Sequence, residues 1–170
     1  MTLSLSTRRD PVCGMDIEVA RSAHSTTYRG LIFHFCSAQC LERFTETPTL
    51  YTNGQRTADI KPMPKKHTLR IAAGTATDVN LACQQIRQMM GIASVSATSA
   101  TDDALIVEYD LRQVSLSQIE AAATAQGLRF KGGLHGFRRG FWKFTEANEA
   151  QNAAHLGSAA CCSRPPSKIR

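Results

Sequence analysis

The stretch YRGLIFHFCSAQCLERF, residues 28–44, decides the fold of the N-terminal part, because it sets two cysteines, Cys36 and Cys40, four positions apart. Its first half predicts a hairpin turn followed by a short apolar strand that ends at Cys36. Ser37 is then a suitable N-cap for a helix, so Cys40 falls one helical turn further along. Both sulfurs can therefore face the same point in space, and the amide groups at the helix start favour the thiolate form.

A third cysteine lies upstream in DPVCGM, residues 10–15. Pro11 fixes one backbone angle, and Gly14 allows a tight reversal directly after Cys13, which places this thiol on an exposed loop knuckle. Three thiolates can therefore converge on one ion. A block of roughly 45 residues buries too little apolar surface to be comfortably stable alone, so a bound metal would also help to hold its fold.

Several side chains could supply a fourth ligand. His24 precedes the hairpin turn and would complete a Cys3His set of the kind that closes a tetrahedral zinc site. His34 lies two residues before Cys36, on the same face by strand alternation, although a histidine in a short strand more often packs or faces solvent. Met15 could offer a thioether to Cu(I), although a methionine after a glycine turn more often serves in hydrophobic packing.

These motifs resemble the YHS domain, a small module of the TRASH-like group of treble-clef metal-binding domains, over residues 10–52. The resemblance rests on DPVCGM and on Ala23-His24, Tyr28-Arg29-Gly30, Phe35-Cys36-Ser37, Cys40, Phe44, Pro48 and Tyr51. It implies a site for copper, zinc or a related heavy metal, with Cys13, Cys36 and Cys40 matching the cysteines of the family. It also implies a role in metal transport, sensing or resistance.

The N-terminal module is expected to end in a linker, residues 53–66. Its second part, RTADIKPMPKK, has two prolines two positions apart and four basic side chains. Such a composition disfavours helix and sheet and predicts a stiff, exposed connector. We therefore place the domain boundary there.

Residues 67–131 predict a second domain with the element order βαββαβ, the ferredoxin-like arrangement. The expected strands are HTLRIAAG, SVSAT, ALIVEYD and GLRF, with one helix capped by Asp78 and a second that starts at Ser115 or Ser117.

In length and element order this second domain looks similar to heavy-metal-associated domains. Those domains carry two cysteines in the loop after the first strand, whereas the corresponding residues 73–78 contain no thiol. Cys83 falls inside the predicted helix and is expected in the core. The domain is then either a degenerate metal carrier kept for docking or an unrelated module for dimerisation or regulation.

The tail, residues 132–170, begins with a basic aromatic helix candidate. Phe137, Phe141 and Phe144 share one helical face, and we expect this stripe to pack on the sheet of the second domain. A partner groove and an anionic membrane surface are the alternatives. Past residue 148 the composition predicts disorder, and the adjacent Cys161 and Cys162 there are either a secondary site for a soft metal or reactive bystanders.

Composition and charge narrow the class of protein. The chain has 170 residues, 42% hydrophobic and 20% charged, and no apolar stretch near the roughly 18 residues of a membrane span. The start MTLSLSTRRD reverses the order of a signal peptide, so we expect a cytoplasmic protein. The net charge of +6 divides into 0 for residues 1–55, +3 for 56–66, −1 for 67–131 and +4 for 132–170. This distribution argues against nucleic acid as a partner.

The sequence thus predicts an α+β protein with a small treble-clef-like metal module, a ferredoxin-like domain and a partly helical, partly disordered tail. We expect it to bind one zinc or copper ion without catalysis, in metal trafficking, buffering or resistance, with a metal transporter or another metal-handling protein as partner. The alternative is a structural-zinc module that binds a protein or nucleic acid. The sequence shows no Ser/His/Asp pattern, phosphate loop or histidine/carboxylate set that would favour an enzyme.

Overall fold

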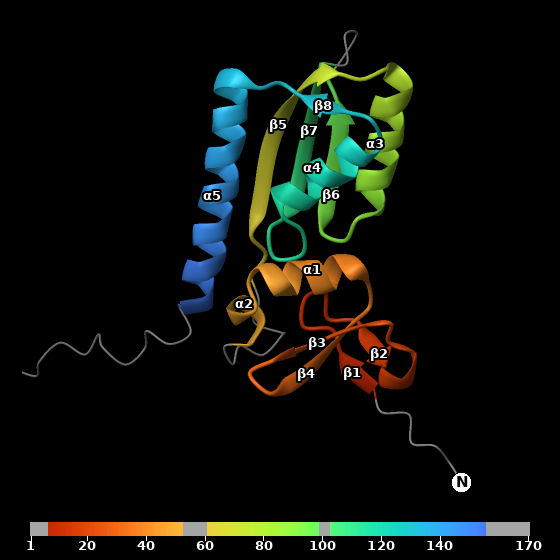
Figure 1. Ribbon diagram of the computed structural model, residues 1–170, viewed down its shortest axis with the longest axis vertical. Helices are drawn as coiled ribbons and strands as arrows, with labels where there is room; N and C mark the ends of the chain where they lie inside the picture. The colour runs from red at the N-terminus through yellow and green to blue at the C-terminus, as the bar shows by residue number, and fades with distance from the viewer. Residues whose placement is uncertain (1–6, 53–60, 99–102, 156–170) are drawn as a thin grey trace, which may run out of the picture.

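The computed structural model describes residues 7–52, 61–98 and 103–155, and it shows a mixed α/β chain in two parts stacked along the long axis (Figure 1). The N-terminal part contains, in chain order, β1 (Thr7–Arg9), β2 (Asp16–Glu18), a 3-10 turn (Val19–Arg21), β3 (His24–Tyr28), β4 (Leu31–Phe35), α1 (Ala38–Glu46) and α2 (Thr49–Thr52). The second part contains β5 (Pro64–Ala73), α3 (Ala76–Gln88), β6 (Ile92–Ala97), β7 (Ala104–Asp110), α4 (Leu116–Ala125), β8 (Arg129–Phe130) and α5 (Gly133–His155).

The N-terminal part is built from two antiparallel hairpins, β1–β2 and β3–β4, with α1 above them (Figure 1). The expected turn between β3 and β4 is confirmed, with positive φ angles of 49° at Arg29 and 78° at Gly30, as two-residue hairpin turns require. Its small core contains Val12, Phe35, Cys40 and Phe44, all nearly inaccessible to solvent. The aromatic ring of Phe44 contacts the rings on β3 and β4, which fixes α1 on the second hairpin.

The second part is a four-stranded antiparallel sheet in the order β6-β7-β5-β8, with α3 and α4 packed on one face (Figure 1). Alternate residues of β5 and β7, including Leu69, Leu105 and Val107, face these helices and are fully buried. Cys83 lies in the same core, as expected. This core is the largest of the three hydrophobic clusters that the described residues form.

The bounds of two elements differ from the sequence prediction. β5 begins at Pro64 rather than at residue 67, so the residues expected as the end of the linker pair with β7 instead. Proline is tolerated there because it is the first residue of the strand. α3 is capped by Thr75, not by Asp78; the Asp78 carboxylate completes the capping box by accepting a hydrogen bond from the Thr75 N–H at 2.8 Å.

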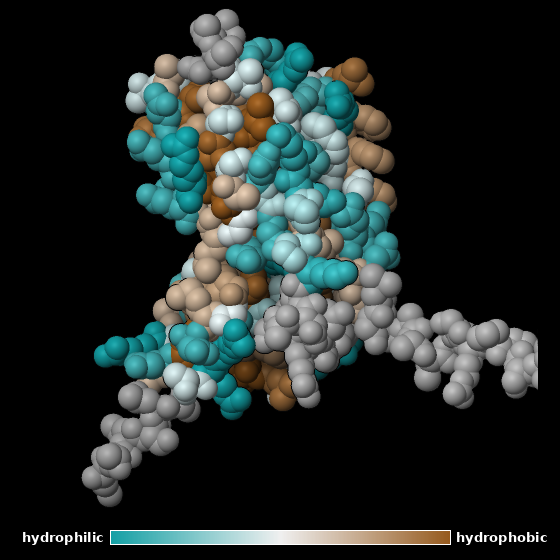
Figure 2. Space-filling model, turned by 180° about the vertical axis from the view of Figure 1, so that it is seen from behind, coloured by the Kyte–Doolittle hydropathy of each residue, from teal (hydrophilic) through white to brown (hydrophobic). Residues whose placement is uncertain are grey.

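α5 contradicts the expectation for the aromatic stripe and for the residues past 148. Phe137, Phe141 and Phe144 are 74%, 59% and 63% exposed, and Figure 2 shows hydrophobic side chains along the edge of the molecule where α5 runs. The face that packs inward instead carries Trp142, Glu146, Ala150 and Ala154, four residues apart in succession.

Both corrections have the same physical reason. Trp142 stacks on His67 of β5, with ring centroids 4.5 Å apart, and Glu146 accepts hydrogen bonds from the Tyr109 hydroxyl and from the Leu116 N–H, the latter at 3.0 Å. Ala150 and Ala154 bury against Leu50 of α2, which keeps the chain helical to residue 155. α5 therefore runs beside the sheet and reaches the N-terminal part.

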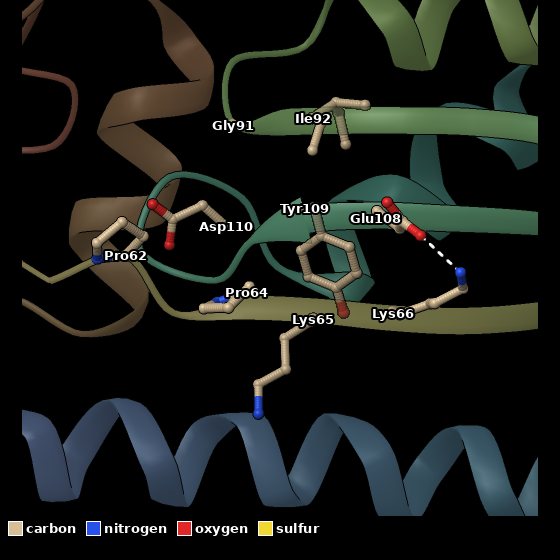
Figure 3. Close-up of a pocket in the computed structure, with 10 residues that line it drawn as sticks. Pro62, Pro64, Lys65, Lys66, Gly91, Ile92, Glu108, Tyr109 and Asp110 are labelled. Atoms are coloured by element: carbon tan, nitrogen blue, oxygen red, sulfur yellow. Dashed lines mark ion pairs between the residues drawn. The ribbon is translucent and has the colours of Figure 1, made fainter.

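The exposed face of the sheet has a shallow hollow of about 470 Å³, shown in Figure 3. Its lining includes Pro62, Pro64, Ile92 and Tyr109, and Lys66 forms an ion pair with Glu108 in it at 2.6 Å. The residues described as lining it include no cysteine, histidine or methionine, so this hollow is distinct from the cysteine cluster. Within the described residues, none of the helices combines the length and the apolar character that crossing a membrane requires.

The two parts are joined by polar contacts from α1 and α2 to the loop after β7. The guanidinium of Arg43 is 3% exposed and donates two hydrogen bonds, from Nε at 2.9 Å and from Nη2 at 2.7 Å, to the carbonyl of Leu111. The Tyr51 hydroxyl donates to the carbonyl of Arg112, and the Ser115 hydroxyl donates to Glu46 at 3.3 Å. The N-terminal part is thus fixed against the second part.

We expect Arg43→Met to lower the free energy of unfolding by about 2 to 3 kcal/mol, because it leaves the buried Leu111 carbonyl without a partner. Arg21→Met is a matched control, since the Arg21 side chain is 83% exposed and its ion pair with Glu18 is worth at most about 1 kcal/mol. Urea unfolding of both variants measures the difference. Equal stability of the two variants would show that the Arg43 contact does not hold the parts together.

Candidate metal centre

The loop between β1 and β2 forms a closed knuckle around Cys13. The N–H of Asp10 donates to the carbonyl of Met15 at 2.8 Å, and the N–H of Gly14 donates to the carbonyl of Asp10 at 2.9 Å. Gly14 has a φ of 79°, a value that glycine adopts without strain, so the expected reversal after Cys13 is confirmed. The Cys13 side chain is half-buried at the tip of this turn.

The second segment of the site is the junction of β4 and α1. β4 ends at Phe35, and Cys36 follows directly. Ser37 is the N-cap of α1, as predicted, and its hydroxyl accepts a hydrogen bond from the N–H of Cys40 at 3.3 Å. The Cys40 side chain is fully buried on the first turn of the helix, whereas Cys36 is half-buried.

Asp10 connects the two segments, a role that the sequence reasoning missed. Its carboxylate is fully buried; Oδ1 accepts from the N–H of Val12 at 2.8 Å and of Cys13 at 3.4 Å, while Oδ2 accepts from the N–H of Cys36 at 2.9 Å. An aspartate two and three residues before the bonded amides is a known turn signal, which the sequence already contained. The bond to Cys36 depends on the fold and has no sequence signal.

The three cysteine sulfurs meet in one place. The Cys13 and Cys36 sulfurs are 3.5 Å apart, the Cys36 and Cys40 sulfurs are 3.7 Å apart, and all three thiols are free. With Asp10 they form a group whose potential ligand atoms lie within 4.8 Å of one another. Sulfurs on a tetrahedral zinc ion, with bonds of about 2.3 Å, are about 3.8 Å apart, so these three thiols have the spacing that such an ion needs.

The protons are unevenly distributed over the three thiols. A hydrogen bond from Cys40 lowers the pKa of Cys13 to about 7, whereas burial and the hydrogen bond to Asp10 raise the pKa of Cys36 to about 11. The pKa of Cys40 is also raised, by its hydrogen bond to Cys13 and by burial. Near neutral pH the cluster therefore offers one thiolate readily, and an ion that binds all three sulfurs must displace the remaining protons.

Comparison with known proteins points to the same N-terminal segment. Residues 9–55 match the YHS domain. Over 43 residues the chain is 41% identical to a protein from Rhizobium leguminosarum bv. viciae described as a copper-transporting P-type ATPase, an alignment that covers 25% of this chain and 5% of that protein. The chain thus spans only a small fraction of the length of this relative. No solved structure matches this chain.

The YHS domain match confirms the resemblance seen in the sequence and extends the expected bounds of 10–52 to 9–55. It contains Cys13, Cys36 and Cys40 as well as Asp10, and it ends before the second part of the chain. The structure therefore brings together the three cysteines that the sequence proposed, and adds a buried carboxylate between them.

The other candidate ligands expected from the sequence are not seen in this group. His24 lies on β3, opposite Phe35, and is not a member of the cluster. His34 lines a separate hollow with Arg8 and Arg9, and its buried Nδ1 has no hydrogen-bond partner among the described residues. The Met15 residue is 52% exposed. Cys161 and Cys162 lie outside the described residues.

Proposed function

We propose that this protein binds one thiophilic ion, copper or zinc, through Cys13, Cys36 and Cys40, and that it traffics, buffers or detoxifies this ion without catalysis. The observation that carries the proposal is the convergence of three free thiols, with sulfur separations of 3.5 and 3.7 Å, from two segments 23 residues apart in sequence. Thiolates are soft ligands, which suit Cu(I) and Zn(II) better than hard cations such as Mg²⁺ or Ca²⁺. When bound, such an ion would also cross-link the knuckle to α1 and stabilise this small module.

The comparisons support copper in particular. The matching protein is described as a copper-transporting P-type ATPase, and the segment of this chain that matches the YHS domain contains the three cysteines. We therefore propose a metal transporter or another metal-handling protein in the cytoplasm as the partner that gives or receives the ion.

The remainder of the fold fits this role. We propose that residues 64–130 form a ferredoxin-like domain, since their strands follow the order β8-β5-β7-β6 with all neighbours antiparallel, and that the N-terminal part is treble-clef-like. The loop before α3 contains no cysteine, so the domain serves docking or regulation and not metal carriage by that loop.

A structural zinc ion is the second candidate, because Cys40 is fully buried and α1 is fixed between the two parts of the molecule. The rate at which the ion leaves separates the two functions. A trafficking site gives up its ion to a competing ligand while the chain stays folded, whereas a structural site loses ion and fold together.

The experiment loads the full chain with Cu(I) or with Zn(II) and then adds a chromophoric chelator, while circular dichroism follows the fold. We expect about one tightly bound ion per chain and its transfer to the chelator with unchanged ellipticity. A chain that ends at residue 155 is the control, and it should bind the same ion equally well because it lacks only the Cys161 and Cys162 pair and its flanks. Loss of ellipticity in step with the ion would establish the structural role instead, and a full chain that binds neither ion would refute both.

A further inference from the structure

A fourth sulfur reaches the cysteine cluster from the second part of the molecule. Met90 lies between α3 and β6, outside the segment that matches the YHS domain. The thiols of Cys36 and Cys40 both donate to its Sδ, at 3.8 Å and 3.9 Å respectively. The Met90 side chain is half-buried and packs against the core of the N-terminal part.

Four of the separations among these sulfurs match the spacing of one coordination shell. Four sulfur–sulfur distances lie between 3.5 and 3.9 Å: Cys13–Cys36, Cys36–Cys40, Cys36–Met90 and Cys40–Met90. A tetrahedron of sulfurs around an ion at about 2.3 Å has edges of about 3.8 Å. The thioether therefore lies at the spacing of a shared coordination shell from two of the three cysteine sulfurs, those of Cys36 and Cys40.

Backbone contacts hold Met90 at this position. Gln39, which lies between the N-cap and Cys40 on α1, donates from Nε2 to the carbonyl of Met90 at 2.8 Å and accepts from the N–H of Met90 at 3.1 Å. The carbonyl of Gln39 in turn accepts from the side chain of Gln118 at 3.2 Å. This reciprocal pair fixes the Met90 backbone against the same helical turn that carries Cys40.

The turn after Met90 is also restricted. Gly91 has a φ of 86°, and a Cβ at this position would lie 2.5 Å from the Cβ of Gln113. A residue with a side chain there would push the turn away from the loop after β7. The position of the thioether is thus set by two independent constraints, the Gln39 pair and the glycine turn.

The carboxylate of Asp10, which also lies beside the three sulfurs, is already used in hydrogen bonds to backbone N–H groups. Its two carboxylate oxygens accept three backbone hydrogen bonds from Val12, Cys13 and Cys36. Coordination through either oxygen would compete with bonds that hold the knuckle in place, whereas the hydrogen bonds that Sδ of Met90 accepts come from the Cys36 and Cys40 thiols themselves.

We propose that Met90 is the fourth ligand of the ion and that the resulting set of three cysteines and one methionine selects Cu(I) over Zn(II). This inference rests on the proposed function of the three cysteines. A thioether is a soft, neutral ligand that suits Cu(I), whereas protein zinc sites use thiolate, imidazole or carboxylate. Because Met90 belongs to the second part, the ion would bond the YHS domain directly to the α/β domain.

Selenium labelling tests the contact in the unmodified sequence. The full chain is produced with selenomethionine at its five methionines, loaded with Cu(I), and measured by X-ray absorption at the selenium edge. We expect a copper neighbour around one selenium position, and we expect Met90→Leu to remove it. A copper neighbour that persists in Met90→Leu would assign the thioether to another methionine and overturn the proposal.

Affinity provides the second measurement. Met90→Leu, which keeps the apolar volume, should weaken Cu(I) binding about tenfold or more, because loss of even an outer-shell partner typically costs about 10- to 100-fold in metal affinity. Zn(II) affinity should change by less than about twofold, since the thioether contributes little to zinc. Met89→Leu is the matched control, because Met89 packs on the core of the second part and should leave both affinities unchanged.

The outcomes separate this inference from the proposed function. A chain that binds copper through its cysteines, shows no selenium neighbour and has equal Cu(I) affinity in Met90→Leu and Met89→Leu refutes the role of Met90 and leaves the three-cysteine site standing. A chain that binds no thiophilic ion refutes the proposed function itself.

Discussion

Cys36→Ser is expected to abolish metal binding, with metal content falling from about one ion per chain to roughly a tenth of that or less, because a closed thiolate site loses its affinity with any one ligand. Replacing Cys36 should reduce metal binding more than any other single replacement, because its sulfur lies within 4 Å of three other sulfurs, those of Cys13, Cys40 and Met90. Serine keeps the size of the side chain but offers a hard, neutral hydroxyl in place of a thiolate. Elemental analysis of the purified protein measures the loss.

Cys83→Ala is the matched control for this variant. Cys83 is a buried cysteine in the core of the second part, outside the cluster, so removing its sulfur should leave the metal content unchanged. Equal metal content in Cys36→Ser and in the wild type would defeat the assignment of the site.

The local parts of this site could be predicted from the sequence because each depends on a few adjacent residues. The hairpin turn at Arg29-Gly30, the N-cap at Ser37 and the reversal at Gly14 all follow from backbone preferences that neighbours do not change. Once these three features are fixed, the cysteines at 13, 36 and 40 can reach one another. The convergence of the thiols was therefore foreseeable without knowledge of the rest of the fold.

The contacts between the two parts could not be foreseen in the same way. Gln39 and Arg43 look like ordinary solvent-facing residues of an amphipathic helix, yet they pair with backbone groups of Met90 and Leu111, 51 and 68 residues further along. Only the packing of α1 on the second part makes them partners. The sequence also did not indicate that the thioether of Met90 reaches the cysteines, since a methionine near the end of a helix usually packs in a hydrophobic core.

The prediction that the aromatic stripe of α5 is buried was wrong for a related reason. Spacing of four and three made Phe137, Phe141 and Phe144 the expected buried face, because aromatic rings gain most from burial. The face that is buried contains Glu146, whose carboxylate is acceptable inside because it accepts hydrogen bonds from the Tyr109 hydroxyl and the Leu116 N–H. The spacing of apolar residues predicts the more hydrophobic face of a helix as the buried one. It gives no information on hydrogen-bond partners that other helices or strands supply.

Asp10 makes local hydrogen bonds, to Val12 and Cys13, and one bond to a distant residue, Cys36. Its replacement is expected to have the second large effect. Asp10→Ala leaves the buried N–H of Val12 and the partly buried N–H groups of Cys13 and Cys36 without their acceptor, so we expect the free energy of unfolding of the metal-free chain to fall by about 3 kcal/mol. Metal affinity should fall as well, since the knuckle is no longer tied to the end of β4. Asp16→Ala, at an exposed position of β2, is the control for loss of a carboxylate and should be near neutral.

Asp10→Asn distinguishes a positioning role from a general loss of stability. The amide oxygen can still accept from Val12 and Cys13, but the amide nitrogen then faces the N–H of Cys36, and two donors repel. We therefore expect Asp10→Asn to keep most of the stability of the knuckle while it weakens metal binding through displacement of Cys36. Denaturant unfolding and chelator competition on the same samples separate the two quantities. If Asp10→Asn binds the ion as tightly as the wild type, the carboxylate stabilises the loop but does not position the sulfurs.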